Sequence, residues 1–178
     1  MAPGAVKVPA RMPCVNATKG WEVAPLPVGH PESAALIRQY YDDIAGRYYG
    51  RPVTTAELDA IVEEFTSDDL TAPTGHFLVG WYDGRSAGCA GLRVLDTRTA
   101  ELTRVYIRPG ARGTGGGGQL LAAAELAARD VLGVSVIRLD TRRDLVEARG
   151  LYAKHGYAEI PAYNNGEYAD HWFEKKLD

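Results

Sequence analysis

The stretch RPGARGTGGGGQLLAAAELAARD, Arg108 to Asp130, decides the fold. Four consecutive glycines, Gly115 to Gly118, stand directly before an alanine- and leucine-rich run with helical periodicity. Glycine costs about 1 kcal/mol relative to alanine in a helix, so a simple helix start would not repeat it. Backbone without side chains can approach a bound group closely, and a helix N-terminus attracts anions. We therefore interpret the stretch as an anion-binding loop that opens a helix.

The segments around this loop predict a single α+β domain. Three strands fall within residues 76–109, and the tight turns Asp83-Gly84 and Asp96 to Thr99 make them antiparallel. The other elements follow from hydrophobic period: a strand at 21–26, helices at 30–50 and 54–65, the helix of the glycine loop, a strand at 134–140, a helix at 143–155, and strands at 157–161 and 168–177. No internal repeat interrupts residues 20–178, and residues 1–19 are expected to form a mobile tail.

Composition excludes several classes of protein. The chain has 178 residues, of which 46% are hydrophobic and 24% charged, as in ordinary globular proteins. A net charge of -3 argues against a broad nucleic-acid surface. No apolar run approaches the roughly 18 residues of a membrane span, and two cysteines make no metal site. We expect a cytoplasmic protein without metal, nucleic acid or membrane as partner.

Three anion-binding motifs compete for the glycine loop. A Walker loop requires lysine where the chain has Gly116. The dinucleotide fingerprint matches Gly113, Gly115 and Gly118, but its first glycine should follow a buried strand directly, and residues 108–112 intervene here. The pattern R-x-x-G-x-G is met by Arg112, Gly115 and Gly117, and it adds a guanidinium to the backbone donors. A flexible turn is the remaining alternative, although turns rarely need more than one or two glycines.

A second block, A-x-x-L-Y-x-K-x-G-[FY], follows in the later helix and strand, at Ala148, Leu151, Tyr152, Lys154, Gly156 and Tyr157. With both blocks in order, the chain resembles the GNAT (N-acetyltransferase) superfamily from about Trp21 to Leu177. Its C-terminal run YADHWFEKKL is similar to a branch of bacterial small-molecule acetyltransferases. The resemblance implies a mixed, mostly antiparallel sheet flanked by about four helices. It also implies acetyl-CoA as donor and the primary amine of a small molecule as acceptor, which attacks the thioester directly.

The resemblance also implies which residues hold the donor. In the family, the arm of coenzyme A lies between the fourth and fifth strands, which here gives contacts to Val105, Tyr106 and Ile107. The pyrophosphate would lie on the loop residues Arg112, Gly113, Thr114, Gly115, Gly116, Gly117 and Gly118. Close approach of the donor demands glycine only at Gly115 and Gly117. The resemblance does not explain the glycines at positions 116 and 118. Leu145 replaces an asparagine that many members carry, so one contact to the arm should be missing or supplied elsewhere.

The same resemblance assigns two catalytic candidates. Tyr152 would protonate the departing thiolate, because an ordinary tyrosine with a pKa of about 10 keeps its proton at neutral pH. Its alternative is a core aromatic residue on an amphipathic helix. Glu101 would deprotonate the acceptor through water, or would simply be a solvated carboxylate at a strand end. His76, His155 and His171 are further candidates for the base.

The acceptor site is expected to have an aromatic, acidic roof. The segment QYYDDIAGRYYG, residues 39–50, includes Tyr40, Tyr41 and Asp43 and suits a small cationic amine. Asn164, in the loop PAYNNGEY, would belong to a second wall, or would only form a turn. Protein N-terminal or lysine acetylation, a non-catalytic CoA-binding sensor and a nicotinamide-dependent reductase stay open as alternatives. A homodimer is also left open.

Overall fold

The structure is a computed structural model in which residues 20–178 are described, so the tail predicted for residues 1–19 lies outside the described residues. Within 20–178, four α-helices and seven strands follow one another in the predicted order. Their bounds are β1 Trp21–Pro25, α1 Pro31–Tyr49, α2 Thr55–Glu64, β2 Gly75–Tyr82, β3 Arg85–Val94, β4 Thr99–Ile107, a 3-10 turn Pro109–Ala111, α3 Gly116–Asp130, β5 Val136–Thr141, α4 Val146–Lys154, β6 Ala158–Ile160 and β7 His171–Lys176.

The strands form one sheet in the order β1-β2-β3-β4-β5-β7-β6. Neighbouring strands are antiparallel except β4 and β5, which run parallel. The β2–β3 turn has Asp83 at φ 48° and Gly84 at φ 80°, the left-handed conformations that a two-residue hairpin requires. The predicted α+β fold, with its mixed and mostly antiparallel sheet, is confirmed.

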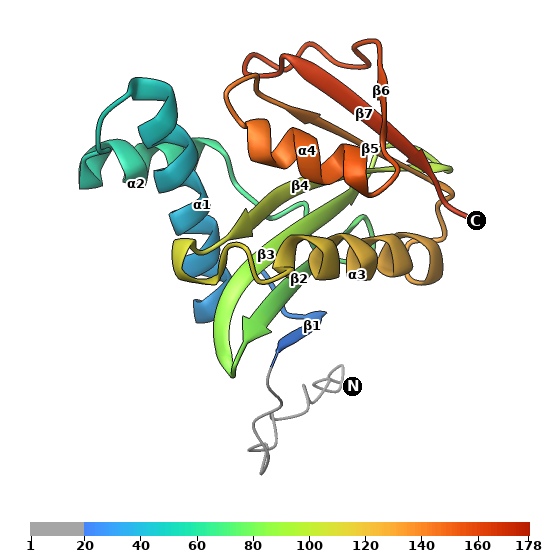
Figure 1. The fold of residues 1–178 in the computed structure, drawn as a ribbon, viewed down its shortest axis with the longest axis horizontal. Coiled ribbons are helices and arrows are strands. Elements are labelled where there is room, and N and C mark those ends of the chain that lie inside the picture. Colours follow the sequence, from blue (N-terminus) through green and yellow to red (C-terminus); the bar gives the residue numbers. More distant parts are fainter. Residues whose placement is uncertain (1–19) are drawn as a thin grey trace, which may run out of the picture.

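Helices cover both faces of the sheet (Figure 1). The buried stripe of α3, including Leu120, Leu121 and Ala124, belongs to one apolar core together with residues of α4 and the central strands. On the opposite face, Leu36 and Tyr41 of α1 pack with Leu58 of α2 in a second core. The chain is therefore a three-layer structure in which α1 and α3 lie on opposite faces of the same strands.

The sheet splits between β4 and β5. The two strands pair only from Thr99 to Glu101, and β4 then continues to Ile107 without its neighbour. Farther along β4, the register with β3 shifts opposite Ala90, and Arg104 has a φ of 56°. This β-bulge and the split leave one edge of β4 open in the middle of the sheet (Figure 1).

Candidate active site

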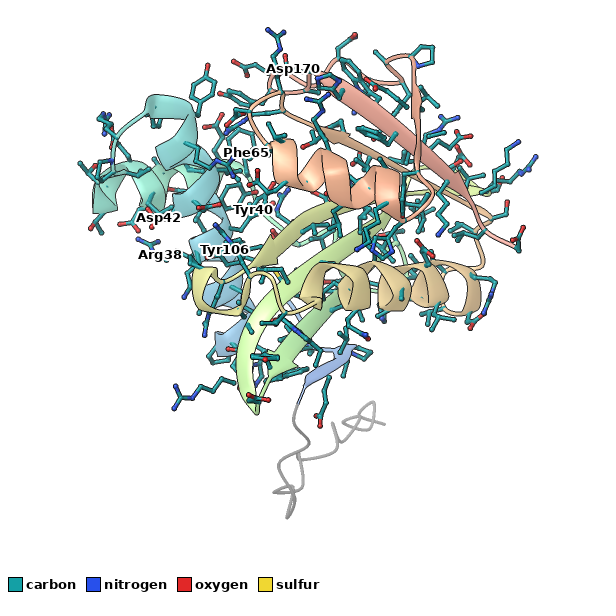
Figure 2. All side chains as sticks on the ribbon, viewed as in Figure 1. Arg38, Tyr40, Asp42, Phe65, Tyr106 and Asp170 are labelled. Atoms are coloured by element: carbon teal, nitrogen blue, oxygen red, sulfur yellow. The ribbon has the colours of Figure 1, made fainter. Side chains whose placement is uncertain are left out.

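A cavity of about 1010 Å³ occupies the split. Its lining comes from α1, the end of α2, Arg93 of β3, β4, the glycine loop, the end of β5 and the segment after it, α4 and residues 166–169. Figure 2 labels three lining residues, Tyr40, Phe65 and Tyr106, in the space between α1 and α2 on one side and α3 and α4 on the other. Elements distant in the sequence thus contribute to one continuous site.

The glycine loop presents a helix N-terminus to this cavity. Gly115 is the N-cap of α3 with a φ of 90°, and Gly113 has a φ of 77°, conformations that favour glycine. Gly116, Gly117 and Gly118 form the first turn, where backbone N–H groups have no acceptor within the helix. All five glycines line the cavity. Free donors and the positive end of the helix dipole therefore meet at one wall.

Packing within the chain explains the two glycines that the sequence left open. A Cβ atom at Gly116 would overlap the indole ring of Trp21. At Gly118 it would lie 2.9 Å from Cε1 of His155, and at Gly117 2.9 Å from a terminal carbon of Leu151. The first turn of α3 is thus wedged between β1 and α4. Close packing therefore favours glycine at three of these four positions, most strongly at Gly116, and the dihedral angle favours it at Gly115.

Trp21 also fixes the loop by hydrogen bonds. Its Nε1 donates to Oγ1 of Thr114 at 2.8 Å, and that hydroxyl donates to the carbonyl of Ala111 at 2.6 Å. Thr114 lies outside the cavity lining formed by the described residues. Its side chain therefore holds the loop in shape instead of facing the site.

Arg112 connects the loop to two other elements. Its Nε donates to the carbonyl of Ile107 at 3.0 Å, and its Nη2 contacts Oδ2 of Asp43 in α1 at 3.3 Å. The guanidinium lies 6.0 Å from the ring centroid of Tyr106. The side chain is 44% exposed, so it could exchange Asp43 for a stronger anion at the same wall.

The open edge of β4 offers main-chain groups to the cavity. Tyr106 pairs with Cys89 of β3, and the N–H of Arg108 donates to Ala87, so these two residues direct their backbone away from the split. Backbone direction alternates along a strand, which turns Val105 and Ile107 towards the cavity. All three predicted contacts, Val105, Tyr106 and Ile107, line it.

Tyr152 combines the two interpretations that the sequence offered. It belongs to the apolar core, with ring centroids 5.9 Å from Tyr157 and from Phe173, and it also lines the cavity. Burial raises the pKa of Tyr152 well above its usual value. Its hydroxyl is therefore protonated at every pH at which the fold would be assayed.

Glu101 is buried, so the alternative of a solvated strand-end carboxylate is wrong. Only 5% of the residue is exposed. Its Oε2 accepts from Nε of Arg93 at 2.6 Å, and its Oε1 accepts from the hydroxyl of Tyr163 at 2.8 Å. Both carboxylate oxygens of Glu101 therefore already accept a hydrogen bond from another side chain.

Asp140 stands beside Glu101 at the diverging end of β5, and the sequence did not indicate it as a catalytic candidate. Its Oδ2 accepts from Nδ2 of Asn164 at 2.7 Å, and the residue lines the cavity. Burial raises the pKa of Asp140; the hydrogen bond from Asn164 lowers it, the charge of Glu101 raises it, and the net shift is upward. The signal in the sequence was an aspartate at the end of the strand that follows the glycine helix.

Asn164 holds the carboxylate of Asp140 by a hydrogen bond from outside the described cavity lining. Its Oδ1 accepts from Nε1 of Trp172 at 2.8 Å while its amide group donates to Asp140. Within residues 20–178, Asn164 does not line the cavity, whereas Gly166 to Ala169 of the same loop do. Of the three histidine candidates for the base, His155 lines the cavity, and His76 and His171 lie outside the lining described here.

The predicted roof residues Tyr40, Tyr41 and Asp43 all line the cavity. The hydroxyl of Tyr41 donates to the carbonyl of Phe65 at 3.1 Å, which joins α1 to the end of α2. The guanidinium of Arg104 lies 5.0 Å from the ring centroid of Tyr41 and 5.9 Å from that of Tyr40. The roof is aromatic as expected, but it encloses a cation as well as acidic groups.

Across residues 20–178, no helix has both the length and the apolar character needed to cross a bilayer.

Comparisons with known proteins agree with this geometry. The family model described as "Acetyltransferase (GNAT) family" matches residues 37–157. An uncharacterised N-acetyltransferase of Mycobacterium tuberculosis and one of Mycobacterium bovis are each 34% identical over 88 residues, which are 49% of this chain and 56% of the relative. The chain thus aligns with about half the length of these curated relatives.

Two solved structures have the same fold. A candidate acyl-CoA N-acyltransferase of Klebsiella pneumoniae is 27% identical, with a TM-score of 0.68, and the match covers 89% of this chain and 98% of that one. The PaiA N-acetyltransferase of Thermoplasma acidophilum, solved with coenzyme A, is 20% identical, with a TM-score of 0.68 and coverage of 88% and 99%. From the glycine loop, the split sheet and the family match, the chain belongs to the acetyltransferase (GNAT) family.

Proposed function

We propose that the protein transfers the acetyl group of acetyl-CoA to the primary amine of a small molecule, by direct attack of the amine on the thioester. One observation carries the proposal: a single cavity joins the glycine loop to Asp140 and Tyr152 through the split between β4 and β5. An anion-binding wall, a proton acceptor and a proton donor therefore border the same space.

The chain's own groups fit coenzyme A. The first turn of α3 offers free N–H donors, and Arg112 offers a guanidinium, which suits a pyrophosphate. The open edge of β4 at Val105 and Ile107 suits an extended arm that carries amide groups. When bound, the donor supplies an activated acetyl group and a thiolate leaving group. Leu145 lines the cavity without offering a side-chain hydrogen bond to the arm.

Asp140 is the stronger candidate for the base. An amine attacks only after it loses a proton, and the raised pKa of Asp140 makes this carboxylate a better proton acceptor than an ordinary aspartate. Glu101, held by Arg93 and Tyr163, adds negative charge beside Asp140 and acts through it. We therefore assign proton removal to Asp140, directly or through water, and a positioning role to Glu101.

Two further groups complete the transfer. The N–H of Val105, on the open edge of β4, can donate to the carbonyl oxygen as negative charge develops. Tyr152 lines the cavity with a hydroxyl that is protonated at neutral pH, and it can donate this proton to the departing sulfur.

The test is release of free thiol from acetyl-CoA across a panel of small amines, amino acids and peptides, with products identified by mass spectrometry. We expect acetylated product from at least one small amine or amino acid. Coenzyme A binding without turnover of any acceptor would favour a sensor. Faster turnover of peptides than of every small acceptor would favour a protein acetyltransferase, and binding of a nicotinamide cofactor in place of coenzyme A would favour a reductase.

A further inference from the structure

Arg104 differs from the other arginines of the cavity. Four arginines that line it each pair with a carboxylate: Arg47 with Glu147, Arg93 with Glu101, Arg112 with Asp43 and Arg142 with Asp144. Arg104 instead donates only to neutral oxygens, at 3.3 Å to Oγ of Ser67, 3.0 Å to Oγ1 of Thr103 and 3.4 Å to the carbonyl of Thr66.

The charge of Arg104 is not matched by a carboxylate in the described part of the chain. Among residues 20–178 Arg104 forms no salt bridge, and residues 1–19 contain neither aspartate nor glutamate. A partly buried charge is costly unless an opposite charge meets it. Arg104 lines the cavity, and its guanidinium packs on Tyr40 and Tyr41, which line the cavity too, so an anion bound there could supply that charge.

The backbone and the roof hold Arg104 in place. Its φ of 56° is unusual for a residue other than glycine, and it results from the β4 bulge. The rings of Tyr40 and Tyr41 pack against the guanidinium. Burial raises the pKa of Tyr40, the charge of Arg104 lowers it and that of Asp140 raises it, so both charges act on the same hydroxyl. Arg104 and Asp140 thus bring a cation and an anion to the same cavity wall as Tyr40.

We infer that the acceptor is an amino acid, whose amine lies at Asp140 while its carboxylate binds the guanidinium of Arg104. The fork of donors on an arginine matches a carboxylate in two parallel hydrogen bonds. This inference rests on the proposed function and narrows it. The simple cationic amine suggested by the sequence would leave Arg104 unpaired, whereas an amino acid satisfies both charges of the site.

The experiment compares each common amino acid with its decarboxylated amine, for example phenylalanine with phenethylamine and tyrosine with tyramine. For the best pair, we expect kcat/KM to be at least tenfold higher for the acid. Arg104→Gln should lower kcat/KM for the amino acid by about 10- to 100-fold, as expected for loss of a charged hydrogen-bonded pair. For the decarboxylated amine, kcat/KM should stay within about twofold of the wild-type value. Arg104→Asn, which suits the left-handed backbone, serves as a second variant.

The matched control is Arg38→Gln. Arg38 pairs with Asp59 of α2 and lies outside the described cavity lining, so this variant should leave kcat/KM unchanged for both the acid and the amine. Equal loss for acid and amine in both Arg104 variants, with normal melting temperatures, would assign Arg104 to the bulge and overturn the inference. A wild-type preference for the amine would also overturn it.

A binding measurement separates this inference from the proposed function. If no acceptor is turned over, the proposed function fails, and calorimetry with coenzyme A present compares N-acetyl amino acids with the corresponding N-acetyl amines. If the N-acetyl amino acids bind more tightly than the N-acetyl amines, and Arg104→Gln abolishes this difference, the inference is supported even without turnover. Equal binding of acids and amines rejects it.

Discussion

The donor side and the acceptor side of the cavity are built in different ways. On the donor side, Arg112 to Gly118 form one contiguous loop whose glycines satisfy backbone angles and close packing. On the acceptor side, side chains from α1, β4, β5 and the loop before β7 meet, as in the hydrogen bonds Asn164–Asp140 and Tyr163–Glu101. A site defined by backbone restricts the residue type at successive positions. A site defined by side chains depends on contacts between distant segments.

The largest effect should follow from breaking the acceptor side at Asp140. Asp140→Asn keeps the shape but cannot accept a proton, so we expect kcat to fall by about 100-fold, the low end for general base catalysis. In the wild type, activity should fall as the pH drops through the raised pKa of Asp140, above the ordinary aspartate value of about 3.9. The variant should lose that acidic limb in a pH–rate profile.

The matched control is Asp59→Asn, which changes an exposed aspartate on α2. This variant should keep both the wild-type kcat and the acidic limb of the pH–rate profile. Full activity of Asp140→Asn, together with a large loss in Glu101→Gln, would transfer the role of base to Glu101.

Tyr152→Phe sharpens the comparison, because Tyr152 lies where the two sides meet. The ring stays in the core while the proton donor is lost, so we expect kcat to fall by about 10- to 100-fold, with the KM for acetyl-CoA nearly unchanged. Because burial raises the pKa of Tyr152, the loss should be the same across neutral and mildly alkaline pH.

Tyr157→Phe removes the hydroxyl of a neighbouring buried tyrosine outside the cavity lining and should leave turnover unchanged. Similar rates for both tyrosine variants would return Tyr152 to a purely structural role.

Gly116→Ala tests the donor side through packing. The added methyl group would overlap Trp21, and overpacking typically costs about 1–3 kcal/mol. We expect that loss in the free energy of unfolding, measured by urea denaturation, and a rise of about tenfold in the KM for acetyl-CoA. Gly110→Ala is the control, since its Cβ meets no atom within 4 Å. Equal stability and donor KM for the two variants would contradict the packing account of Gly116.

The smallest effect should follow from Arg112→Ala. The guanidinium is partly exposed and already shared with Asp43 and the carbonyl of Ile107, so we expect only about a fivefold rise in the Kd for coenzyme A. Binding should also depend less on salt, because one screened charge is gone. Titrations at several ionic strengths measure both effects, with Arg98→Ala, in the turn before β4, as control. An unchanged Kd at every salt concentration would remove Arg112 from the donor site.

The difference between the two sides also explains what the sequence could predict. The order of the elements and the β2–β3 turn depend on local patterns such as Asp83-Gly84, and both were predicted. The need for glycine at Gly116 could not be predicted, because Trp21, which packs there and bonds to Thr114, is 93 positions away from Thr114. The pairing of Asp140 with Asn164 likewise depends on how β5 and the later loop meet. Nor does the sequence reveal which of the described arginines that line the cavity forms no ion pair.

The three tryptophans give the protein its own optical reporters. The indole N–H of Trp21 bonds to Thr114 in the donor loop, that of Trp81 to Glu32 at the start of α1, and that of Trp172 to Asn164 behind Asp140. Indole emission responds to the polarity and hydrogen bonding around the ring. Variants that keep one tryptophan and replace the other two by phenylalanine would therefore report on one region each. The arrival of donor and acceptor could then be followed separately by fluorescence, without an attached dye.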